Sequence, residues 1–165
     1  MAGGGIAASI NKIKGETLTL QNQRQEALRG RTKLQEAVST LKNQKKEVHS
    51  NLNKMYSGLE KINGAIAQLK AHPAGTEHPQ IAEQLGKLRA QKEQIISQIS
   101  YLKNASKTIG SRINEFSNKL SSLGENIEMM GSAIGARKGA LQKLAGQAAA
   151  QIGLNSNREL GRKKG

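Results

Sequence analysis

Apolar residues recur along this chain at alternating intervals of four and three residues, in two long arrays. The first array comprises Ile6, Ile10, Ile13, Thr17, Leu20, Arg24, Ala27, Arg31, Leu34, Val38, Leu41, Lys45, Val48, Leu52, Met55, Leu59, Ile62, Ile66 and Leu69. The second keeps the same spacing from Ile81 to Ala148. This alternation is the heptad repeat of a coiled coil, in which positions a and d form a seam against a partner helix. The pattern therefore predicts two long helices, each with a narrow seam.

A short segment between the two arrays breaks the helical pattern. It contains both prolines of the chain, Pro73 and Pro79, with Gly75 between them. Proline disfavours helical geometry in the residue before it, and glycine permits a turn. Thr76 is a suitable cap for the helix that follows. We therefore predict an all-α fold, a long antiparallel two-helix coiled-coil hairpin with a Pro/Gly turn at about 71–80.

The predicted organisation has five parts. They are a flexible leader at 1–5, a first coiled-coil arm at 6–70, the turn, a second arm at 81–152, and a basic flexible tail at 153–165. Arms of nearly equal length and a single Pro-rich break favour the hairpin over an end-to-end rod that dimerises through both arrays. The sequence leaves open whether each seam is filled by the chain itself or by a second chain, and whether the hairpin belongs to a larger helical assembly.

Polar residues interrupt the seam at a positions. Besides Thr17 they are Arg24, Arg31, Lys45, Lys92 and Ser106. Polar residues at a specify the register and the number of strands of a coiled coil, at a cost in stability. We therefore interpret these residues as the ones that set the register of the hairpin.

Several glycines lie in the columns beside the seam, at positions e and g. The residues that we single out are Gly30, Gly58, Gly110, Gly124 and Gly131, with Gly135 and Gly139 continuing from Gly131 at intervals of four. A glycine inside a helix costs roughly 1 kcal/mol relative to alanine, but small residues let another backbone approach closely. Two interpretations stay open: tight packing within the hairpin, or lateral docking of a third helix from another copy or a partner.

The net charge of +14 favours acidic partners. The residues we consider for anion binding are Arg29, Lys33, Arg137, Lys138 and Lys143. In a hairpin, the last three would lie beside the N-terminal residues and form a basic, Gly/Ala-rich tip suited to an anionic membrane surface. Nonspecific binding to nucleic acid is the other interpretation of the charge. Aromatic residues, which commonly stack on bases, make up only 2% of the chain.

No constellation of catalytic residues stands out, and we expect no enzymatic activity, no cofactor, no metal and no small-molecule substrate. The chain has no cysteine, which excludes disulfides and thiolate ligands. His72, His78 and Glu77 flank the turn, but a metal site needs convergent ligands, and we interpret them as loop residues. Neither a signal peptide nor an apolar run of membrane-spanning length is evident. The predicted location is cytoplasmic, virion-associated or exported without a cleaved leader.

The leading hypothesis is a non-enzymatic structural or adaptor protein that assembles by coiled-coil packing with copies of itself or a helical partner. A Cys-free, aromatic-poor helical hairpin rich in Gln, Asn, Ser, Ala and Gly resembles three groups of proteins. These are subunits of exported filaments, small helical partners of secretion systems, and internal or tail proteins of bacteriophages. The resemblance is one of composition and architecture, and it implies no particular residue. The alternative is a basic module that binds nucleic acid or an anionic membrane, for example a phage ejection protein or a leaderless exported hairpin.

Overall fold

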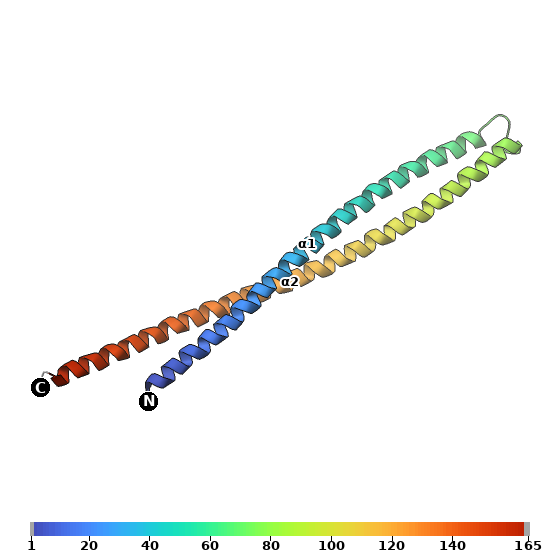
Figure 1. Cartoon of the computed structure of the whole chain (residues 1–165). Helices are drawn as coiled ribbons and strands as arrows, with labels where there is room; N and C mark the ends of the chain where they lie inside the picture. Colours follow the sequence, from blue (N-terminus) through green and yellow to red (C-terminus); the bar gives the residue numbers. More distant parts are fainter. Residues whose placement is uncertain (1, 164–165) are drawn as a thin grey trace. The chain divides into compact units, whose positions relative to one another are not determined.

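The protein consists of two long helices joined by a short turn (Figure 1). The computed structural model describes residues 2–163, and their side chains over residues 5–154. Helix α1 spans Ala2–Lys70 (69 residues) and helix α2 spans Pro79–Lys163 (85 residues). No strand occurs between residues 2 and 163. The predicted all-α helical hairpin is confirmed.

Each half of the hairpin forms a unit of its own. One unit combines Met1–Leu34 with Lys119–Gly165, and we call it the terminal unit. The other is Gln35–Asn118, which contains the turn, and we call it the turn unit. Within each unit a segment of α1 packs against a segment of α2 (Figure 1).

Burial follows the heptad repeat without exception in both arrays. Every a and d position from Ile6 to Leu69 and from Ile81 to Ala148 is buried or half-buried, and every b, c and f position there is exposed. Nine apolar side chains are only 4–8% exposed: Val38, Leu41, Leu52, Ile66, Ile81, Leu85, Ile99, Ile127 and Ile134. None of the described side chains is less than 2% exposed. The core is therefore a single line of seam residues, as expected where two helices alone pack against each other.

The two arms are antiparallel and their register is regular. In the terminal unit, Arg137 on α2 pairs with Glu16 on α1, whereas Leu123 lies against Gly30, where an added β-carbon would meet its Cδ2 atom at 3.8 Å. The second contact therefore lies two heptads later on α1 and two heptads earlier on α2 than the first. In the turn unit, Gly58 lies against Ile95 in the same manner. Each seam in the two units is filled by the chain itself.

The turn is held by backbone hydrogen bonds and by both of its histidines. The N–H of Gly75 donates to the carbonyl of His72 (3.0 Å), and Gly75 has a φ of +81°. The Nδ1 atom of His72 accepts a hydrogen bond from the N–H of Ala74 at 3.0 Å. The side chain of His72 thus holds the backbone of the turn through its Nδ1 atom.

The start of α2 differs from the sequence-based expectation. Pro79 is the first helical residue, and the Nδ1 atom of His78 accepts a hydrogen bond from the N–H of Gln80 at 3.3 Å. His78 is therefore the N-cap, and the predicted cap at Thr76 is wrong. Proline is favoured at the first position of a helix, which places the cap at the residue just before it.

Both helices extend beyond the predicted arms. Helix α1 begins at Ala2, within the predicted leader 1–5, and α2 continues through Gly153–Asn157 to Lys163, within the predicted tail. Extending an existing helix needs no new nucleus, so each added backbone hydrogen bond offsets much of the cost of roughly 1 kcal/mol for an isolated glycine. The predicted tail ends in Lys164 and Gly165, which lie outside the described residues.

We predict that Gly75→Ala lowers the free energy of unfolding by about 1–2 kcal/mol, because a β-carbon is unfavourable at its positive φ. The matched control is Gly64→Ala, in the last two turns of α1, where an added β-carbon meets nothing within 4 Å. This control should gain up to about 1 kcal/mol from helix propensity. Denaturant unfolding followed by circular dichroism measures both, and a change of the same sign in both variants would contradict the prediction.

Candidate functional site

The polar residues predicted to set the register all lie in the seam. Arg24, Arg31, Lys45, Lys92 and Ser106 are half-buried. Thr17, at another a position, is only 6% exposed, and its hydroxyl donates to the carbonyl of Ile13 at 2.7 Å. The buried hydroxyl of Thr17 thus forms its hydrogen bond within its own helix, whereas the charged residues have to extend their long side chains past the seam to reach water.

Arg24 is the least well accommodated of these residues. Its Nε atom is buried and has no hydrogen-bond partner among the described residues. A β-carbon added at Gly131 would lie 3.5 Å from this atom, so the missing side chain of Gly131 makes room for the guanidinium group. A buried donor without a partner costs about 1–3 kcal/mol. The burial of Arg24 therefore lowers stability, and its role in setting the register stays a prediction.

Arg137 occupies a d position and is engaged within the hairpin. Its Nε atom donates to Oε2 of Glu16 at 3.2 Å, and its Nη1 atom donates to the carbonyl of Ala133 at 3.4 Å. The side chains of Arg137 and Glu16 are 35% and 43% exposed, so the pair is worth no more than about 1 kcal/mol. This residue, considered for anion binding from the sequence, has its charge already paired with a carboxylate.

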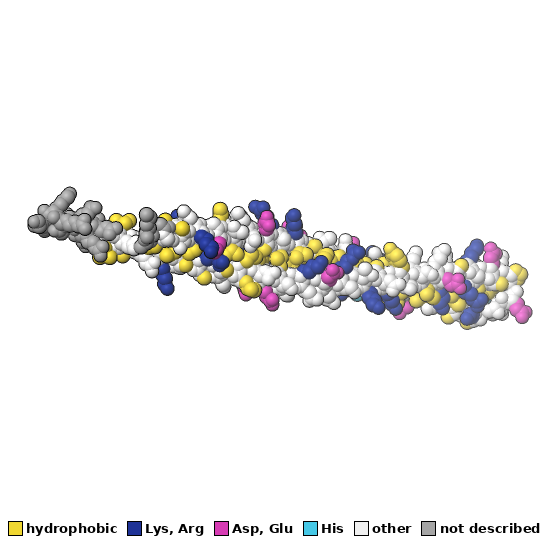
Figure 2. Space-filling view, turned by 90° about the horizontal axis from the view of Figure 1, so that it is seen from below, with side chains coloured by type: hydrophobic (Ala, Val, Ile, Leu, Met, Phe, Trp, Pro, Cys, Tyr) yellow, Lys and Arg dark blue, Asp and Glu magenta, His cyan; other side chains and the backbone are white. Residues whose placement is uncertain are grey.

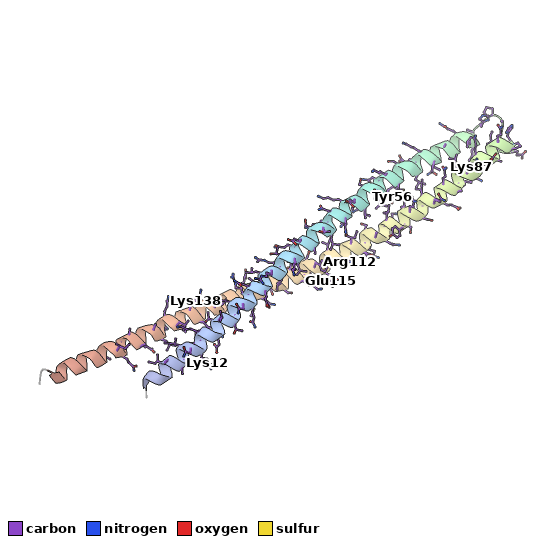
Figure 3. The ribbon with its side chains drawn as sticks, in the orientation of Figure 1. Lys12, Tyr56, Lys87, Arg112, Glu115 and Lys138 are labelled. Carbon is purple, nitrogen blue, oxygen red and sulfur yellow. The ribbon has the colours of Figure 1, made fainter. Side chains whose placement is uncertain are left out.

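The other four residues considered for anion binding are exposed but lie in different columns. Arg29 is at f and Lys33 at c on α1, whereas Lys138 is at e and Lys143 at c on α2. Figure 3 shows Lys138 on α2 and Lys12 on α1. The structure does not gather these residues into one dense cluster, and any anion binding there would be diffuse.

The seven glycines separate into two groups. Gly30, Gly58 and Gly131 lie against the opposite arm, at distances of 3.8, 3.7 and 3.5 Å from an added β-carbon to the nearest side-chain atom. The other four have nothing within 4 Å of that position, and they are Gly110, Gly124, Gly135 and Gly139. The first group fits packing within the hairpin, and the second leaves open surface on α2.

The two sides of the seam in the turn unit differ in charge. On the side formed by e positions, Lys42 and Lys70 of α1 accompany Arg89 and Lys103 of α2. The Nζ atom of Lys103 lies 5.7 Å from the ring centroid of Tyr56, a cation–π contact between the arms. Figure 3 labels Tyr56 on α1. Sequence reasoning missed this contact, which becomes visible only once e positions of antiparallel arms are placed side by side.

Open grooves flank the seam in both units. The groove in the turn unit has a volume of about 540 Å³ and is lined by Ala65, Gln68, Leu69, His72, Gln84, Lys87 and Leu88. The groove in the terminal unit, of about 520 Å³, is lined by Asn11, Lys12, Gly15, Glu16, Thr19, Leu20 and Arg137. Among the residues that the structure describes, no three His or Glu side chains come together as metal ligands would.

Several large apolar side chains remain at the surface, as Figure 2 shows along the helices. Those more than 40% exposed are Leu18, Tyr56, Ile96, Tyr101, Met129, Ile152 and Leu154.

Comparison of the chain with protein-family models, curated proteins and solved structures found no match in any of the three. Within the described part of the chain, neither helix has a stretch apolar enough to cross a membrane.

We predict that Arg24→Leu raises the free energy of unfolding by about 1–3 kcal/mol, because it removes a buried donor that lacks a partner. The matched control is Arg29→Leu, which removes the same charge from an exposed f position and should change stability by less than about 0.5 kcal/mol. Denaturant unfolding measures both variants. An Arg24→Leu protein less stable than the wild type would contradict the prediction.

We predict that Gly124→Ala raises stability by up to about 1 kcal/mol, because the added methyl group meets open space and alanine favours the helix. Gly131→Ala should gain less, since its methyl group would contact Arg24. Thermal unfolding followed by circular dichroism ranks the two. A loss of stability at Gly124 would show that another helix occupies the space beside it.

Proposed function

We propose that this chain is a non-enzymatic structural or adaptor protein that assembles through helical packing with copies of itself or with a helical partner. A component of a virion, a filament or a secretion apparatus would have this role. The observation that carries the proposal is the burial pattern. The a and d seam is filled within each unit, and every b, c and f position of the two arrays stays exposed. Association with another helix would therefore use the sides of the hairpin.

The thin core supports the same proposal. No described side chain is less than 2% exposed, and Tyr101 and Met129, at 74% and 70%, contribute nothing to the seam. A single line of seam residues between two helices buries little apolar surface for each ordered residue. Assembly would bury more of that surface and offset the free-energy cost of the glycines and charged residues in the arms.

A second candidate function is a basic module for nucleic acid or an anionic membrane surface. It is favoured by the side of the turn unit that carries Lys42, Lys70, Arg89 and Lys103. Cations on one side of a helical hairpin attract phosphate groups without reading sequence, and such binding weakens steeply as salt rises.

Size-exclusion chromatography with light scattering, together with circular dichroism, tests the first proposal against the second. We predict a highly helical protein with a mass above that of one chain, retained from about 0.1 M to about 1 M salt, because packed apolar surfaces are insensitive to screening.

Binding to a mixed-sequence DNA duplex and to vesicles with anionic lipid is measured at the same two salt concentrations. Tight binding at low salt by a chain that remains a monomer would favour the basic module. A monomer of low helix content would contradict both proposals.

A further inference from the structure

Five lysines gather on one side of the turn unit, with no carboxylate among them. A helix turns about 100° per residue, so position e lies roughly 40° around the axis from a, and b comes next. Over residues 38–59 of α1 and the facing residues 95–116 of α2, the a, b and e positions form one side of the hairpin, which we call the lysine face. Its charged residues are Lys42, Lys45, Lys46, Lys103 and Lys107.

The opposite side of the same stretch is electrically balanced. Its c and g positions carry two cations, Lys54 and Arg112, together with two carboxylates, Glu47 and Glu115. Figure 3 labels Arg112 and Glu115 on α2. The f positions of both arms in this stretch are uncharged. The excess positive charge of this part of the turn unit therefore lies on the lysine face.

The hairpin gains no ion pair from these lysines. No ion pair between described residues involves any of the five. Lys42 and Lys46 are four residues apart on α1, and like charges at this spacing destabilise a helix. Lys103 and Lys107 repeat the arrangement on α2. The lysine face therefore lowers the stability of the chain alone, and an anionic partner would relieve that cost.

Two exposed apolar side chains lie beside the lysines. Tyr56 and Ile96 occupy e positions of opposite arms and are 41% and 47% exposed. They come to nearly the same level of the hairpin, because Gly58 lies against Ile95. The Nζ atom of Lys103 lies 5.7 Å from the ring centroid of Tyr56, which places the charge next to the apolar pair. The lysine face thus offers apolar contact and positive charge along one line.

We propose that the lysine face is the docking site of an acidic amphipathic helix from a partner protein. This inference rests on the proposed function, and it names the surface and the chemistry of the helical partner. The carboxylates of the docked helix would lie against the lysines, and its apolar residues would cover Tyr56 and Ile96. The stretch from residue 38 to 59 is about 33 Å long, enough for a docked helix of about six turns.

A second copy of the chain and a nucleic acid both match the lysine face less well. A chain with a net charge of +14 would bring its own lysines against this side. A nucleic-acid backbone would pair its phosphates with the lysines, but it would leave Ile96 without an apolar partner. A helix supplies carboxylates and apolar side chains together.

An anionic bilayer is also a poorer match, because the apolar residues of the lysine face are set inward. Tyr56 and Ile96 are at e, next to the line between the two arms, where a third helix would reach them. A bilayer would first meet the b positions, and a membrane-binding helix needs apolar residues on its outer face. Apart from two lysines, the exposed b positions are all polar, namely Ser39, Asn53, Ser100 and Asn114.

The test uses a fluorescent acidic peptide of about three heptads, with leucine at a and d and glutamate at e and g. A scrambled peptide of the same composition keeps the charge but loses the amphipathic face. Fluorescence anisotropy in about 0.15 M salt measures the affinity of the full chain for each. We expect the heptad peptide to bind at least about tenfold more tightly. Equal affinities would show that charge alone attracts the peptide, and would overturn the inference.

Two double variants of the full chain locate the binding surface, each removing one cation from each arm. Lys46→Gln/Lys107→Gln changes the lysine face, and Lys54→Gln/Arg112→Gln changes exposed positions of the opposite side. Glutamine has a helix propensity similar to those of lysine and arginine, so circular dichroism should show both variants folded. We expect the first to weaken binding of the heptad peptide by about tenfold and the second by less than about twofold. Equal losses would overturn the inference.

Ile96→Gln separates a helical partner from phosphate groups. Its matched control is Tyr101→Gln, which replaces an exposed apolar side chain at a c position on the opposite side. We expect only Ile96→Gln to weaken binding of the heptad peptide, by about fivefold or more. It should leave unchanged any binding to a mixed-sequence DNA duplex or to phosphatidylserine-containing vesicles, which depends on charge. A duplex or vesicle bound more tightly than the heptad peptide would assign the lysine face to phosphate groups and overturn the inference.

Light scattering of the chain without peptide distinguishes failure of the inference from failure of the proposed function. A chain that self-associates but does not bind the heptad peptide would overturn the inference and leave assembly between copies. A chain that neither self-associates nor binds the peptide would contradict both.

Discussion

The packing of a and d side chains between antiparallel arms is the interaction on which the rest of the structure depends. It alternates residues such as Ile66 and Leu69 of α1 with Ile81 and Leu85 of α2, and it leaves the outer three positions of every heptad in water. Isolated helices of ordinary composition are marginal in water, and most helical stability in proteins comes from packing an apolar stripe. With 18 glycines in the chain, the two helices depend on this seam even more strongly than usual.

The seam also contains residues that weaken it. Arg24 holds a buried Nε atom without a partner among the described residues, and Arg137 occupies a d position where an apolar residue would pack better. In coiled coils generally, polar residues at seam positions specify the register at a cost in stability of this kind. At Gly131, the absence of a side chain leaves room for the guanidinium group of Arg24.

Because the seam is used within the chain, the sides of the hairpin become the surfaces available for partners. In the turn unit the e and g positions differ in charge, with Lys42, Lys70, Arg89 and Lys103 at e positions and Arg112 as the charged residue at the g positions. The e positions would therefore attract an acidic ligand more strongly than the g positions.

The sequence by itself determined the helical hairpin, the line of the seam and the place of the turn. A two-position stripe without a slip in register admits few other arrangements, and Pro73 and Pro79 bracket the only break in it. Tertiary structure decided what local patterns could not. It selected His78 over Thr76 as the cap of α2, separated the packed glycines from the open ones, and paired Arg137 with Glu16. Each of these depends on which residue of the opposite arm, or of the turn, lies nearby, and spacing along one helix carries no such information.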